Sequence, residues 1–137
     1  SDVGQYAIPI LFFQPGKDWH TQSPGPAQQT DILPTVLNYL GYDKKFIAFG
    51  SDLFDPEAPR FSVHYITGLY GMIKDWYYLE FDGTRCTSLF YLKNDPLLKN
   101  NLAGSMKSVE ERLVLFLKAY IQQYNNRVVE NRLTTDG

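Results

Sequence analysis

Apolar residues recur at helical spacing in two stretches of the chain. The first stretch predicts a helix at residues 31–40, in which four side chains at steps of three and four share one face. These four are Leu33, Val36, Leu37 and Leu40. Thr30 or Asp31 can cap the first turn, and Gly41 follows the last turn, where a left-handed residue is often found. The apolar face predicts that this helix packs against another part of the protein.

The second helical pattern is longer and lies near the C-terminus. Ser108 and Glu111 have the spacing of a capping box, which predicts that the helix begins there. Its apolar stripe runs for about four turns. The stripe comprises Val109, Leu113, Phe116, Leu117, Tyr120, Ile121 and Tyr124. The sequence then becomes polar, so the helix is expected to end between Asn125 and Leu133. One long apolar stripe predicts a helix that covers a sheet face.

Between these helices the pattern changes to strands. Aromatic and β-branched residues are concentrated at residues 61–66, 69–75, 76–83 and 87–92. Plausible turns between these segments contain Gly68, Lys74-Asp75 and Asp82-Gly83. In the third segment, alternation places Tyr77, Leu79 and Phe81 toward the core, and leaves Trp76, Tyr78 and Glu80 at least partly exposed. The segments predict a meander of about four antiparallel strands.

A continuous apolar run occupies residues 7–13. Such a run is typical of a strand that is covered on both faces, as in a parallel sheet, and Pro9 favours an edge or first position. The chain offers few parallel partners for such a strand, which suggests that it was cut from a larger sheet. Residues 14–27 are rich in proline and glycine and predict a surface loop that contains Trp19 and His20.

Together the patterns predict an α+β fold. A roughly four-stranded antiparallel sheet is packed by the long C-terminal helix, and one strand and one helix precede it. The 137 residues suffice for a single domain with a real core. Hydrophobic residues make up 44% of the sequence and aromatic residues 15%, which argues against a disordered chain.

Charge and hydropathy indicate which classes of binding partner to expect. The net charge is −2 with both signs interspersed, so there is no basic surface for nucleic acid, and we expect no nucleic-acid partner. Membrane contact is not indicated, because no apolar run approaches the roughly 20 residues that a spanning helix needs. The N-terminal residues also lack the pattern of a signal segment.

Few residues of the sequence are candidates for catalysis, redox chemistry or metal binding. Cys86 is the only cysteine, so it cannot form an internal disulfide, and we interpret it as a strand residue rather than a nucleophile. His20 is expected to cover a surface edge, and His64 to make a hydrogen bond within a strand rather than bind a metal. The tyrosines of the sheet could stack on a ligand, although cross-strand packing is the simpler interpretation.

Three segments carry a resemblance to a known family. They are IPILFFQPG at residues 8–16, QQTDILPTVLNYLGYDKKFIAFG at residues 28–50, and SDLF at residues 51–54. Their order and spacing resemble the closing part of the catalytic domain of sulfatases and of their relatives in the alkaline phosphatase superfamily, including the membrane-anchored lipoteichoic-acid-synthase-like transferases. The resemblance implies that residues 1–60 (strand 7–13, helix 31–40) end the α/β catalytic domain. Residues 61–137 would form the C-terminal subdomain of antiparallel sheet and helix.

The segment LFYLKNDPLLKNNLA at residues 89–103 carries a second resemblance. It is similar to the C-terminal sulfatase signature L-Y-D-L-x-x-D-P-x-E-x-x-N-L. The residues that match the signature are Leu89, Leu92, Asp95, Pro96, Asn101 and Leu102. The sequence departs at Phe90, Tyr91 and Leu98, which places it in a divergent branch. Asp95-Pro96 is expected to start a turn, and Asn100-Asn101 to bond to nearby backbone.

The catalytic residues of that superfamily are not recognisable in this sequence. Its enzymes use Thr, Ser or a formylglycine as nucleophile beside one or two divalent metal ions held by Asp and His, including an Asp-His pair. Neither His20 nor His64 follows an Asp. Ser1-Asp2 resembles the start of an S-D-H-G motif, but Val3 replaces its histidine. We therefore assign no catalytic, cofactor-binding or metal-binding residue to this chain; a divalent metal (Ca, Mg, Mn or Zn) is implied only for the parent enzyme.

The resemblance implies a function for the parent rather than for the chain alone. The chain would be the C-terminal fragment of a sulfatase, or of a related phosphoglycerol or phosphoethanolamine transferase, inactive by itself. Its partner would be the N-terminal catalytic part of the same protein, which would lie on the extracytoplasmic side of a bacterial membrane. Separated from that part, residues 7–13 could drive self-association. The alternative is a free-standing α+β binding module that uses its aromatic sheet face.

Overall fold

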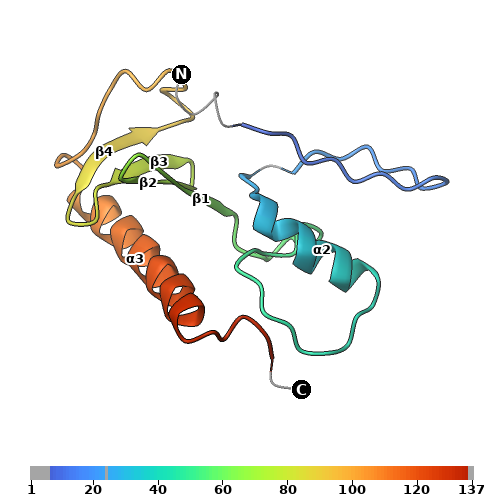
Figure 1. Ribbon diagram of the computed structural model, residues 1–137. Coiled ribbons are helices and arrows are strands. Elements are labelled where there is room, and N and C mark those ends of the chain that lie inside the picture. Colours follow the sequence, from blue (N-terminus) through green and yellow to red (C-terminus); the bar gives the residue numbers. More distant parts are fainter. Residues whose placement is uncertain (1–6, 24, 136–137) are drawn as a thin grey trace.

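The computed structural model describes residues 7–23 and 25–135. A short 3₁₀ helix and an α-helix come first, then four strands, then a long helix (Figure 1). The elements are η1 Gln29–Asp31, α2 Ile32–Tyr39, β1 Phe61–Ile66, β2 Leu69–Lys74, β3 Tyr77–Phe81, β4 Cys86–Tyr91 and α3 Lys107–Val129. The α+β fold predicted from the sequence is therefore confirmed.

The four strands form one antiparallel sheet in the order β1-β2-β3-β4. The first two connections are tight two-residue turns, at residues 67–68 as predicted and at residues 75–76, one residue later than the predicted Lys74-Asp75, whereas the third spans residues 82–85. Thr67 and Gly68 have φ of 49° and 88°, and Asp75 and Trp76 have φ of 52° and 66°. Two consecutive left-handed residues match the twist of the flanking strands. β1 has the predicted bounds, and each of the other strands differs from its predicted bounds by one or two residues at an end.

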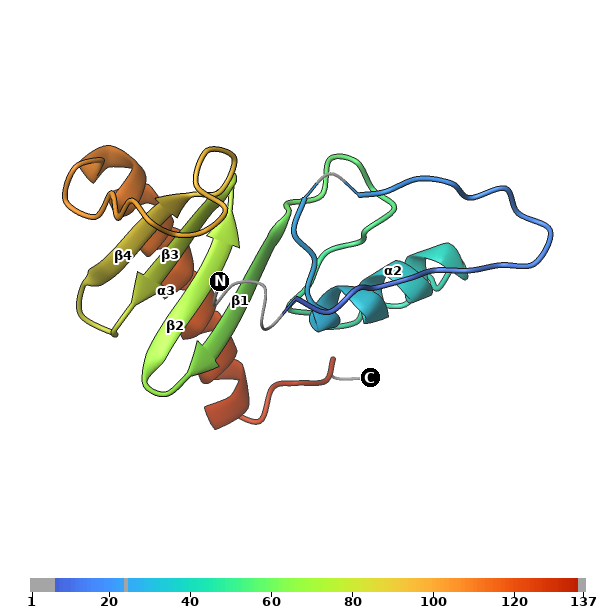
Figure 2. The ribbon, with the colours of Figure 1, turned by 90° about the horizontal axis from the view of Figure 1, so that it is seen from above.

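The core lies between the sheet and α3, which runs across one sheet face (Figure 2). Its fully buried side chains are Met72, Leu79, Leu89, Leu113 and Leu117. Leu113 and Leu117 belong to the predicted stripe of α3, and Leu79 to the predicted core-facing set of β3. The long helix therefore covers the sheet as its pattern indicated.

Two details of this region differ from the sequence prediction. The helix begins at Lys107 with Met106 as its N-cap, so Ser108 lies inside the first turn and the expected capping box is wrong. Instead, the Gly104 N–H donates to Glu110 Oε2 at 2.8 Å. The second detail is Tyr78, which is only 5% exposed although it points away from α3. The rings of His64 and Phe90 stack beside it, and its hydroxyl donates to Glu80 Oε1 at 3.1 Å.

The first helix presents the opposite face to that expected. Leu33, Val36 and Leu40 are exposed, whereas Asp31, Pro34 and Thr35 are buried. Of the four residues of the predicted stripe, only Leu37 is half-buried, so the described residues do not supply the packing partner that the stripe was expected to have. The cap is also different, because no side chain caps the first turn of α2, and Asp31 instead accepts a hydrogen bond from the Gln28 N–H, the residue that precedes η1.

Residues 7–13 form no strand, which corrects a second expectation. No strand of the described residues pairs with this segment, and Leu11 is 87% exposed. The segment is held beside α2 by the Phe12 ring against Phe54 and by a hydrogen bond from the Tyr39 hydroxyl to Gln14 nearby. Residues 7–23 extend past α2 as an open loop (Figure 2).

Polar bridges join this N-terminal region to the sheet. The Val63 N–H of β1 donates to Gln28 Oε1 at 3.1 Å, and Gln28 Nε2 donates to the Phe49 carbonyl at 3.4 Å. The Arg60 guanidinium donates to three backbone carbonyls between residues 52 and 55. The Phe49 ring also contacts Tyr124 of α3. The α2 region is therefore attached to β1 by the Gln28–Val63 hydrogen bond and to α3 by the Phe49 ring, which contacts both Tyr120 and Tyr124.

Candidate functional site

The residues that could take part in catalysis or metal binding do not lie together at one site. His20 lies on an exposed loop, where its Nε2 is 2.7 Å from Asp18 Oδ1. Cys86 lies in β4, and burial raises the pKa of its thiol to about 11. It is therefore protonated at neutral pH and is a poor nucleophile. Ser1 and Asp2 lie outside the described residues. Within residues 7–23 and 25–135, no group of three or more His, Cys, Asp or Glu side chains could hold a metal ion.

His64 lies on the sheet face opposite α3, with its imidazole above Gly71. A Cβ at position 71 would come within 2.2 Å of His64 Nε2, so only glycine leaves room for the ring. Burial lowers the pKa of His64, although the Glu80 carboxylate partly opposes this shift. A neutral imidazole stacked on Tyr78 indicates a packing role in the sheet.

The first family-like motif holds a turn against α2. The buried Asp31 carboxylate accepts the Gln28 N–H at 2.8 Å and the Ser51 N–H at 2.7 Å. The Thr35 hydroxyl donates to the Asp31 carbonyl at 2.6 Å and accepts the Leu53 N–H at 2.9 Å. A Cβ at Gly50 would lie 2.3 Å from the Thr30 carbonyl. We call this hydrogen-bond network, in which Asp31 and Thr35 bind the backbone of Gln28, Ser51 and Leu53, the polar lock. Its side chains hold backbone in place, which is a structural role.

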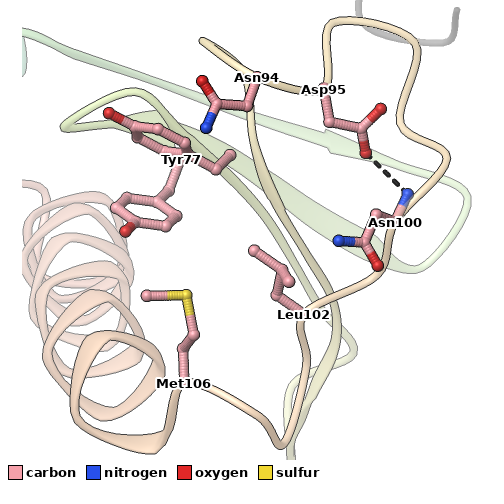
Figure 3. A pocket seen from close by; sticks show the side chains of 7 residues that line it. Tyr77, Asn94, Asp95, Asn100, Leu102 and Met106 are labelled. Carbon is pink, nitrogen blue, oxygen red and sulfur yellow. Dashed lines mark hydrogen bonds between the residues drawn. The ribbon is translucent and has the colours of Figure 1, made fainter.

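The second family-like motif shapes the loop between β4 and α3. The Asp95 carboxylate accepts the Lys99 N–H at 2.9 Å and the Asn100 N–H at 2.7 Å (Figure 3). These two hydrogen bonds lower the pKa of Asp95 and keep it ionised. The turn predicted at Asp95-Pro96 is confirmed, and the carboxylate closes the loop on itself.

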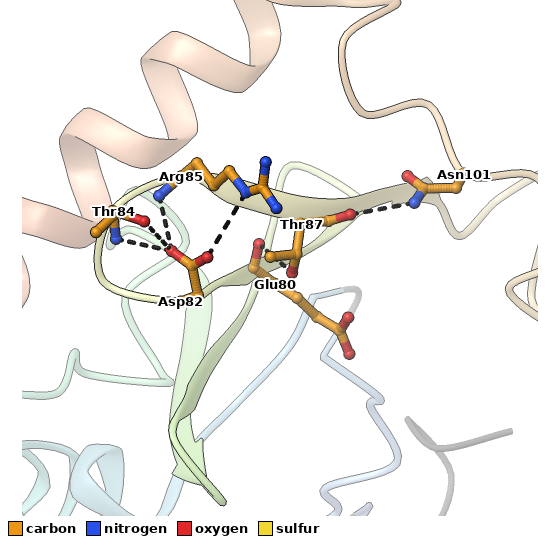
Figure 4. A network of polar contacts seen from close by, with 6 residues as sticks. All are labelled: Glu80, Asp82, Thr84, Arg85, Thr87 and Asn101. Carbon is orange, nitrogen blue, oxygen red and sulfur yellow. Dashed lines mark hydrogen bonds and ion pairs between the residues drawn. The ribbon is translucent and has the colours of Figure 1, made fainter.

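Asn101 then fixes the end of this loop to β4. Its Oδ1 accepts the Leu89 and Ala103 N–H groups, both at 3.0 Å, and its Nδ2 donates to the Thr87 carbonyl at 3.2 Å (Figure 4). The Leu102 N–H also donates to the Leu89 carbonyl at 2.7 Å. The expectation that Asn101 bonds to backbone is confirmed, and the outer edge of β4 is covered at this point.

A cavity of about 400 Å³ lies where this loop meets the sheet and the start of α3 (Figure 3). Its lining residues are Tyr77, Tyr91, Asn94, Asp95, Asn100, Leu102 and Met106. The Tyr77 and Tyr91 rings are neighbours, with centroids 4.9 Å apart. Sequence reasoning did not identify this cavity, because its residues come from β3, β4, the loop and α3. The available signal was an asparagine-rich loop directly after a strand that ends in tyrosine.

Comparison with known proteins identifies no relative. No family model matches the chain, and neither the curated proteins nor the solved structures that were searched contain a match. No helix among the described residues is long and apolar enough to cross a membrane.

Proposed function

We propose that the chain is the C-terminal part of a sulfatase-superfamily enzyme, where it completes the catalytic domain without supplying a catalytic group. The support from the sequence is the order of the two family-like motifs. The support from the fold is that Asp31 and Asn101 of those motifs anchor backbone turns, which is a structural task.

The observation that carries this proposal is the outward apolar face of α2. Leu33, Val36 and Leu40 are exposed, and residues 7–13 form a second apolar segment that pairs with no strand of the described residues. An exposed apolar face next to an unpaired extended segment is costly in water unless another part of the protein covers it. In this proposal, an α/β sheet of the catalytic part would provide both the strand neighbours and the cover.

In this proposal the N-terminal catalytic part of the same polypeptide is the partner. It would supply the nucleophile and all ligands of the divalent metal, since the described residues offer no ligand set for one. The reaction would be sulfate-ester hydrolysis or the related transfer of a phosphoglycerol or phosphoethanolamine group. The parent would act on the extracytoplasmic side of the membrane.

The reading frame upstream of the Ser1 codon tests the proposal. We expect it to encode, in frame, a Thr- or Cys-centred nucleophile motif followed by an Asp-His pair. A stop codon followed by a start codon immediately before this chain would contradict the proposal and favour a free-standing module.

The isolated chain provides a second test. We expect no turnover of an aryl sulfate or an aryl phosphate with added divalent metal. Turnover that survives purification and is lost in His20→Ala or His64→Ala would show that the chain has a catalytic site of its own.

A further inference from the structure

The cavity at the start of α3 combines an apolar floor with a polar rim. Tyr77, Leu102 and Met106 are partly buried and pack at the edge of the core, and the half-buried Tyr91 ring lies against Tyr77. Asn94, Asp95 and Asn100 come from the loop above them (Figure 3). Small-molecule sites commonly have this composition, in which aromatic and aliphatic side chains give contact area and a few polar groups fix the orientation.

The charge of the lining restricts the ligand. None of the cavity-lining residues is Lys or Arg, so a sulfate or phosphate group would find no cation among them to pair with. The one charged lining residue is Asp95, and its carboxylate already accepts two backbone N–H groups. A ligand with a net negative charge is therefore disfavoured.

The polar groups also discriminate between a cation and a neutral ligand. A cation could pack on the tyrosine rings and use the acceptors, but it would leave unused the N–H donors that each asparagine amide at this rim also offers. A hydroxylated ring matches both kinds of group through its O–H groups, and its C–H face can pack on tyrosine. We propose that this cavity binds a neutral hydroxylated ring, such as one unit of a saccharide. This proposal is independent of the proposed function.

An NMR titration of the full chain tests the proposal. The probes are a panel of methyl glycosides, with choline as a cation of similar size and inorganic sulfate as an anion. We expect saturable shifts of the amides of residues 94–102, Tyr77 and Tyr91 with at least one glycoside at millimolar to tens-of-millimolar concentration. The proposal is overturned if no glycoside gives saturable shifts there, or if choline or sulfate binds there more tightly than every glycoside.

Matched variants locate the site. Asn94→Ala and Asn100→Ala each remove one amide that can bond to the ligand, and we expect the Kd to rise about five- to tenfold. Asn125→Ala on the exposed surface of α3 is the control and should bind as the wild type does. Unchanged shifts elsewhere in each spectrum establish that the variants are folded. Wild-type affinity in both cavity variants would contradict the proposed site.

Discussion

The sheet with α3 and the region around α2 are stabilised in opposite ways. In residues 61–129, apolar side chains of the sheet and of α3 meet in a fully buried core. In residues 7–60, the buried side chains at α2 include Asp31 and Thr35, whereas Leu33, Val36 and Leu40 point outward. In the first region the apolar faces predicted from the sequence are buried, and in the second region the predicted apolar face of α2 is mostly exposed.

This difference separates the residues that hold a segment in place from those that need a partner. The hydrogen bonds of Asp31 and Thr35 position the α2 region against the turn at residues 51–53. They contribute nothing to covering the leucines on the other side of the helix. A helix can therefore be well anchored in this chain and still present an exposed apolar face.

Truncation of a core leucine should give the largest loss of stability. Leu117→Ala removes a fully buried side chain between α3 and the sheet, and we expect a loss of about 2–5 kcal/mol in the free energy of unfolding. Leu33→Ala, at a position that is 52% exposed, should change it by no more than about 0.5 kcal/mol. Denaturant melts measure both values. Equal losses would show that the two leucines have similar surroundings, and the comparison would fail.

Loss of the buried carboxylate should cost less. Asp31→Ala leaves the Gln28 and Ser51 N–H groups without their acceptor, which we expect to cost about 1–3 kcal/mol. Faster hydrogen exchange should appear at Ser51 before it appears in the sheet. The exposed Asp43→Ala is the control and should leave that exchange unchanged. Unchanged protection of Ser51 in Asp31→Ala would mean that the polar lock does not hold this turn.

A smaller effect is expected at the exposed turn between β3 and β4. Asp82 Oδ1 accepts the Thr84 hydroxyl and the N–H groups of Thr84 and Arg85 (Figure 4). These bonds lower the pKa of Asp82 from 3.8 to about 2. Because the folded pKa lies below the unfolded value, the stabilisation is present above pH 3.8 and is lost as the pH falls toward 2. An NMR titration of the carboxyl measures this pKa. An ordinary value would show that the turn is not held by Asp82.

The sequence predicted the sheet region well for a physical reason. Alternation along each strand and the stripe of α3 both describe faces that are buried within this chain, so the pattern and the packing agree. Tyr78 is the exception, because its burial depends on the Phe90 ring of the adjacent strand β4 and on the His64 ring of β1, which reaches it across Gly71 of β2. Such a lateral contact cannot be inferred from one strand.

The prediction failed where an apolar pattern has no packing partner among the described residues. The stripe of α2 identified the apolar face correctly but could not show whether this chain covers it. Residues 7–13 have the composition of a buried strand, yet the described residues offer no strand to pair with them. The cavity could not be predicted either, because the loop at residues 93–102 must first fold back onto Tyr77 and Tyr91.

The central claim is that the outward face of α2 requires a cover that the isolated chain lacks. Sedimentation velocity over a range of concentrations tests it with Leu40→Lys on this face and Leu115→Lys on α3, since both leucines are 71% exposed. We expect the average mass of the wild type and of Leu115→Lys to rise with concentration. Leu40→Lys should self-associate much more weakly, because a lysine interrupts the apolar face. A wild-type chain that stays monomeric at every concentration, or equal association in both variants, would contradict the claim.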